Sequence, residues 1–154
     1  MLRKLLARIF YRFWQFKQVL LPKLVVREWL EAVAVLDEPL RHQLARLKKS
    51  EKAHVMRVYT DICQAHGLPE DVQKCLLELA LLHDIGKTVT RPSLLFKVAK
   101  VLFPIANTGH CIEGARLLRR FHQNRQLIRR VLRHHDETTS DPILRMFQEF
   151  DDRN

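Results

Sequence analysis

Flexible residues are scarce in this sequence. Its 154 residues include only four glycines and six prolines, and they contain no low-complexity run. Flexible linkers between domains are usually rich in glycine, serine or proline, so this composition favours one domain with few mobile connections. With 47% hydrophobic residues, the chain is long enough to bury a core of its own.

Cysteines are also few, and their spacing indicates no disulfide framework. Cys63, Cys75 and Cys111 are widely separated and form no Cys-x-x-Cys pair. Each falls in an apolar helical pattern, so we interpret all three as reduced thiols that pack as small core residues. No stretch of about 18 apolar residues occurs, and no secretory signal is recognisable. We therefore expect a cytoplasmic protein without a transmembrane helix.

Acidic residues are absent before Glu28, whereas arginine and lysine are frequent there. Leucine, isoleucine and phenylalanine fall on one helical face of this segment, and most of the basic residues fall elsewhere. We predict that residues 1–44 form a basic helical extension, with an amphipathic helix that ends near Pro22 and one or two shorter helices in residues 24–47. The first helix could pack on the rest of the protein, lie peripherally on an anionic membrane, or contact nucleic acid, which is not favoured.

Apolar residues recur at helical spacing through most of the remaining chain, and no alternating run predicts a strand. We therefore predict an all-α fold. One core-facing stripe follows His54, and another carries Leu76 and Leu79 toward His83. Further helices are expected in residues 93–103, 110–121, 127–135 and 143–151. The core-facing stripe predicted in residues 110–121 consists of Ile112, Ala115, Leu118 and Phe121. The one predicted in residues 127–135 consists of Leu127, Ile128, Val131, Leu132 and His135.

The segment from Leu82 to Lys87 reads Leu-His-Asp-Ile-Gly-Lys and closes an apolar run. A buried carboxylate beside an imidazole is costly unless a cation neutralises it, and a divalent metal ion does so well. Asp84 could bridge two metal ions, His83 could bind one, and Lys87 could contact an anionic oxygen. The alternative is a helix C-terminus at which a histidine and an aspartate are neighbours by chance.

Other candidate metal ligands follow in a defined order along the chain. His54 precedes the His83-Asp84 pair, and behind it come His110, the pair His134-His135 and the carboxylates Asp151-Asp152. One histidine beside an apolar stripe is usually a hydrogen-bonded residue of the fold, but five of them with these aspartates form a pattern. In residues 45–152 the chain resembles the HD-domain metal-dependent phosphohydrolases, in particular the HDIG-type branch.

The resemblance implies a ligand set and two divalent ions. Its core set corresponds to His54, His83, Asp84 and a late aspartate, which we place at Asp151 with Asp152 as the alternative. The additional histidines that HD-GYP phosphodiesterases use for a second metal correspond to His110, His134 and His135. Some of those enzymes hold a third metal through a glutamate, but Ser50 occupies that position here. No Gly-Tyr-Pro loop follows the histidine pair, so the resemblance does not extend to cyclic di-GMP specificity.

The residue types agree with hydrolysis of a phosphate ester. Imidazole and carboxylate ligands suit Mn, Fe, Mg, Zn, Co or Ni, and bound divalent ions acidify water and polarise a phosphoryl oxygen. We expect Asp84 and Lys87 to be catalytic and residues 45–154 to form an HD phosphohydrolase domain. The formal net charge of +10 would attract a phosphorylated small molecule or nucleotide. Two alternatives remain: a non-catalytic HD module for signalling or binding, and a basic helical protein that binds nucleic acid.

Overall fold

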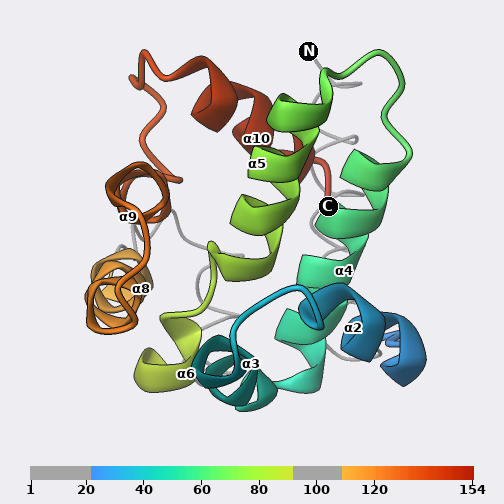
Figure 1. The fold of residues 1–154 in the computed structure, drawn as a ribbon, viewed down its shortest axis with the longest axis vertical. Coiled ribbons are helices and arrows are strands. Elements are labelled where there is room, and N and C mark those ends of the chain that lie inside the picture. Colours follow the sequence, from blue (N-terminus) through green and yellow to red (C-terminus); the bar gives the residue numbers. More distant parts are fainter. Residues whose placement is uncertain (1–21, 92–108) are drawn as a thin grey trace, which may run out of the picture.

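The computed structural model describes residues 22–91 and 109–154, and these residues form helices and no β-strand (Figure 1). The all-α prediction is therefore confirmed. In these two ranges, no helix has both the length and the apolar character needed to cross a membrane. The basic amphipathic helix predicted before Pro22 and the helix predicted in residues 93–103 lie outside the described residues. The membrane, nucleic-acid and domain-boundary interpretations of residues 1–44 consequently stay predictions.

Two short helices precede the longer ones, as predicted for residues 24–47. The helices, labelled as in Figure 1, are α2 (Val26–Val33), α3 (Glu38–Ala45), α4 (Lys49–Cys63), α5 (Glu70–Leu82), α6 (Lys87–Thr90), α8 (Gly109–Arg120), α9 (Arg125–Leu132) and α10 (Pro142–Asp152).

Local sequence signals set the ends of the helices that carry the candidate site. Pro69 is the N-cap of α5, where its missing N–H costs nothing because the first turn has no acceptor for it. The Asn124 side chain accepts a hydrogen bond from the Leu127 N–H and so caps α9. Asp141 caps α10 in the same way through the N–H groups of Ile143 and Leu144, and such caps contribute about 1 kcal/mol each.

The core lies where α4, α5 and α10 pack together, and α9 contacts α5 from another side. Leu76, Leu79 and Val58 are fully buried in it, as is Phe147 of α10. The Phe147 ring packs against the His83 ring, with centroids 5.1 Å apart. This aromatic contact ties the C-terminal helix to the end of α5, so the core that forms the fold also positions His83.

Helix α8 buries Ala115 and Leu118 of its predicted core-facing stripe but not Ile112. Ile112 is 44% exposed, whereas His110, Cys111, Gly114, Ala115 and Leu118 are buried. The reason is a close approach between backbones: a Cβ added at Gly86 would lie 1.8 Å from the carbonyl oxygen of His110. This contact between Gly86 and His110 sets the rotation of α8 about its axis. The spacing of apolar residues in the sequence cannot reveal such a contact.

Two further core predictions are wrong. Cys63 is exposed and Cys75 is intermediate, so of the three cysteines only Cys111 is buried. Cys63 is the last residue of α4, where the helix runs out of the core. Leu132, predicted to face inward with Val131, is 38% exposed because it ends α9 just before the chain turns toward the histidine pair.

Candidate metal centre

His83 and Asp84 directly follow α5 and are each only 1% exposed. The Nδ1 atom of His83 lies 2.9 Å from the carbonyl oxygen of Ala80. A carbonyl oxygen can only accept, so Nδ1 donates and Nε2 points away from α5 toward Asp84 Oδ2, at 3.4 Å. A backbone partner of this kind fixes the ring orientation of a metal-binding histidine.

The carboxylate of Asp84 faces two different groups of side chains. Its Oδ2 contacts the Lys87 ammonium and His83 Nε2, while its Oδ1 lies 3.5 Å from His110 Nε2. Burial alone would raise the pKa of Asp84, but Lys87 and then His83 hold it well below its usual value. Burial alone would likewise lower the pKa of Lys87, yet the Asp84 carboxylate raises it. Both partners are therefore charged.

The first group of side chains consists of His54, His83, Asp84 and Asp151, which we call the first cluster. The donor atoms of His54, His83 and Asp84 lie within 4.8 Å of one another. Asp151 Oδ1 lies 2.9 Å from His54 Nε2 and 3.6 Å from His83 Nε2. Helices α4 and α10 thus bring a histidine and a carboxylate to the end of α5. Asp152, the alternative late ligand, is exposed.

Charge and hydrogen bonding in the first cluster favour a cation. Burial alone would raise the pKa of Asp151, but the His83 and His54 imidazoles hold it well below its usual value. Burial alone would lower the pKa of His83, and the Asp84 and Asp151 carboxylates raise it instead. Among the described residues, neither His83 Nε2 nor Asp151 Oδ1 has a well-aligned hydrogen-bond partner. Buried polar atoms of this kind, aimed at one point, fit a divalent ion.

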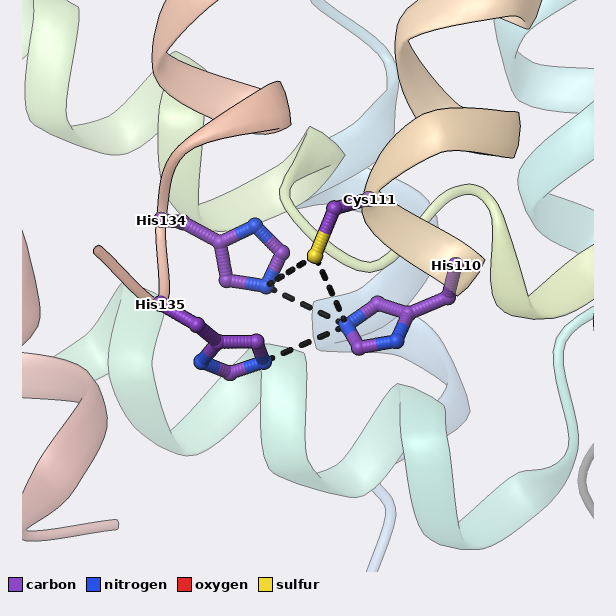
Figure 2. Close-up of side chains that lie close together, drawn as sticks. All are labelled: His110, Cys111, His134 and His135. Carbon is purple, nitrogen blue, oxygen red and sulfur yellow. Dashed lines mark hydrogen bonds between the residues drawn. The ribbon is translucent and has the colours of Figure 1, made fainter. Parts of the chain in front are cut away.

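The second group, called the second cluster, consists of His110, Cys111, His134 and His135 (Figure 2). Its four donor atoms also lie within 4.8 Å of one another. The Nε2 atoms of His134 and His135 each lie 3.3 Å from His110 Nε2. His134 Nδ1 lies 2.7 Å from the Val131 carbonyl oxygen, so this ring is oriented like that of His83.

Burial keeps two imidazoles of the second cluster, those of His110 and His134, neutral. It lowers the pKa of His110 to about 3 and that of His134 well below its usual value, in spite of the nearby Asp84 carboxylate. A neutral imidazole has the free lone pair that a metal ion requires.

The structure brings all seven predicted ligand residues to one place. The two clusters meet at Asp84 and also where the His83 and His134 rings lie 5.3 Å apart, centroid to centroid. His42, His66 and His122, which belong to neither cluster, are exposed. Cys111 was not predicted as a ligand, although its position next to His110 at the start of α8 is a signal for it. The histidine and carboxylate donors suit divalent transition metals or magnesium, whereas the catalytic roles of Asp84 and Lys87 stay predictions.

A comparison with protein families agrees with this geometry. The family model described as the HD domain matches residues 40–151. HD domains are generally metal-dependent phosphohydrolases. The match does not distinguish the HDIG and HD-GYP subtypes. Neither the curated proteins nor the solved structures include a significant match.

Proposed function

The chain belongs to the HD-domain family, and on this premise we propose that it hydrolyses a phosphomonoester or phosphodiester bond with two divalent ions. The first cluster holds one ion and the second cluster holds the other. The observation that carries the proposal is the position of Asp84, whose Oδ1 faces His110 while its Oδ2 faces His83. A carboxylate placed in this way lies between the two ion sites and can bind one ion while it offsets the charge of the other.

The residues around Asp84 have separable tasks in this proposal. Bound divalent ions supply Lewis acidity and lower the pKa of water. The backbone hydrogen bonds of His83 and His134 hold both rings with Nε2 toward the centre. Lys87 pairs with Asp84 and places a positive charge beside the carboxylate, where it stabilises negative charge on a phosphoryl oxygen.

A phosphorylated small molecule or nucleotide is the substrate class that we propose. Exposed arginines on α8 and α9 support it, because their positive field attracts phosphate groups and raises association rates. The exposed members are Arg116, Arg119, Arg120, Arg125 and Arg129.

Hydrolysis assays with simple phosphate esters test the proposal. Protein stripped with a chelator is reconstituted with Mn²⁺, Co²⁺ or Zn²⁺ and given p-nitrophenyl phosphate and bis-p-nitrophenyl phosphate. We expect turnover only with metal, its loss in His54→Ala and in Asp84→Asn, and its retention in His66→Ala, which removes an exposed histidine outside both clusters.

The two alternatives give different results. A non-catalytic HD module would bind metal and a nucleotide without turnover under every metal condition. A nucleic-acid-binding protein would show strongly salt-dependent binding of RNA or DNA and no metal stoichiometry. Either outcome, reproduced with folded protein, would overturn the proposed hydrolysis.

A further inference from the structure

We propose that the Cys111 thiolate is the fourth ligand of the second ion and makes the second cluster a tetrahedral site for Zn²⁺ or a similar soft cation. The proposal rests on the proposed function, since it specifies one of its two ion sites. It also assigns a role to a cysteine that sequence patterning indicates only as a core residue.

Two nitrogen–nitrogen distances in the second cluster equal the edge of a tetrahedral zinc site, and two sulfur–nitrogen distances are about 0.2 and about 0.5 Å longer than its edge. Zn–N bonds of about 2.0 Å and Zn–S bonds of about 2.3 Å imply tetrahedral N···N edges of about 3.3 Å and S···N edges of about 3.5 Å. The two N···N contacts to His110 are both 3.3 Å. Cys111 Sγ lies 3.7 Å from His110 Nε2 and 4.0 Å from His134 Nε2. An octahedral Mg²⁺ site would need shorter edges, of about 2.9 Å.

The surroundings of Cys111 fit a ligand better than a packing residue. The side chain is 1% exposed, and Figure 2 shows its sulfur pointing with the three imidazoles toward one centre. Thiolates select Zn²⁺ and other soft ions over Mg²⁺ and Mn²⁺. One thiolate and three neutral imidazoles leave one positive charge on a divalent ion, and the buried Asp84 carboxylate, 3.5 Å from His110 Nε2, balances it.

This ligand set makes the two ion sites unlike each other. Four protein donors close a zinc site, whereas catalytic sites keep an open position. The second cluster would then have no position left for water. The nitrogen and oxygen donors of the first cluster also suit ions of higher coordination number, which leave room for water and substrate. The other candidate for the fourth ligand of the second ion is Asp84 Oδ1. An experiment must therefore distinguish binding by the Cys111 sulfur from binding by the Asp84 carboxylate.

Cobalt spectroscopy makes that separation. In the Cys63→Ser/Cys75→Ser background, Cys111 is the single thiol left among the three cysteines. Metal-free protein is titrated with Co²⁺, and we expect a near-ultraviolet band of sulfur-to-cobalt charge transfer together with the intense visible bands of tetrahedral Co²⁺. Zn²⁺ should displace this cobalt, and it should protect the Cys111 thiol from a disulfide reagent. Adding Cys111→Ser should abolish the charge-transfer band, and adding Asp84→Asn should keep it.

Each result is decisive. If the protein that keeps Cys111 binds Co²⁺ without a charge-transfer band, the thiolate is not a ligand, and this result does not depend on whether the Cys111→Ser variant folds. An unchanged band in the Cys111→Ser variant would overturn the proposal as well. If a protein without the charge-transfer band still shows metal-dependent hydrolysis, the proposed function stands without the thiolate ligand. Charge transfer without hydrolysis under any metal supports the ligand and contradicts the function, and no Co²⁺ binding at all overturns both.

Discussion

Replacing Gly86 by alanine should dismantle the second cluster. A Cβ at Gly86 would lie 1.8 Å from the carbonyl oxygen of His110 and 2.5 Å from the backbone nitrogen of Gly114. Ordinary contacts of a carbon atom begin near about 3.5 Å, so the start of α8 must move by roughly 1.5 Å or more. Backbone atoms cannot rotate aside as a side chain can.

The cost of Gly86→Ala follows from this displacement. Overpacking in a core typically costs about 1–3 kcal/mol, and we expect the upper end because both contacts are backbone. The displaced carbonyl belongs to His110, so His110 and Cys111 move relative to Asp84 and His134. One ion per chain should be lost while the first cluster, built from α4, α5 and α10, keeps its own.

Urea unfolding followed by circular dichroism measures the stability, and elemental analysis counts the ions. Gly114→Ala is the matched control. Its Cβ would meet a side-chain methyl group of Val131 at 3.1 Å, and alanine gains up to about 1 kcal/mol of helix propensity over glycine. We therefore expect that control to be close to neutral. Wild-type stability and ion content in Gly86→Ala would refute the reasoning.

Substitutions at three more residues test other contacts. Asp84→Asn should lower metal-dependent turnover at least about 100-fold with the helical circular dichroism spectrum kept, since a charged ligand becomes a weak neutral one; unchanged turnover would contradict the role of Asp84 as a ligand. Lys87→Ala should reduce turnover less and leave metal affinity, measured by calorimetry, equal or tighter, because the ammonium that pairs with Asp84 is gone; weaker affinity would count against this. Asp141→Ala should destabilise α10 by about 1 kcal/mol in urea unfolding through loss of its N-cap. For the same carboxylate, Arg130 and the cap N–H groups lower the folded-state pKa although burial alone would raise it. Its charge therefore stabilises the fold above the unfolded-state pKa of about 3.9 and is lost as the pH falls through the lower folded value. The advantage of the wild type over Asp141→Asn should then shrink below about pH 4, and an advantage that grows there would contradict the assignment.

Much of the candidate site could be predicted from sequence because its ligands are motifs of distinctive residues in a fixed order. The His83-Asp84 pair, the His134-His135 pair and His110 needed no knowledge of packing. The choice between Asp151 and Asp152 did need it, since adjacent helical residues point about 100° apart. The contact of Asp151 with His54 now separates the two.

The periodicity of α8 predicts the burial of Ala115 and Leu118, but not the exposure of Ile112. Its rotation depends on the contact between Gly86 and His110, which joins residues far apart in the sequence. For the same reason Cys111 was interpreted as a core residue although it faces three imidazoles. Long-range backbone contacts of this kind leave no trace in local hydrophobic patterns.

The end of the chain is held more firmly than a terminus ordinarily is. Arg153 Nε lies 3.0 Å and Asn154 Nδ2 2.9 Å from Asp61 Oδ2 of α4. The carbonyl oxygen of Asn154 accepts a hydrogen bond from Arg57. Asp151 therefore sits on a helix that packing and hydrogen bonds position beside His54, and removal of the metal should loosen α10 without releasing it.

The most direct test of the metal centre is elemental analysis of protein purified without a chelator or a histidine tag. We expect about two divalent ions per chain, the loss of the first-cluster ion in the His83→Ala/Asp84→Ala variant, and both ions kept in His66→Ala. Folded wild-type protein that carries no divalent ion and takes none up, or a double variant with undiminished ion content, would contradict the account.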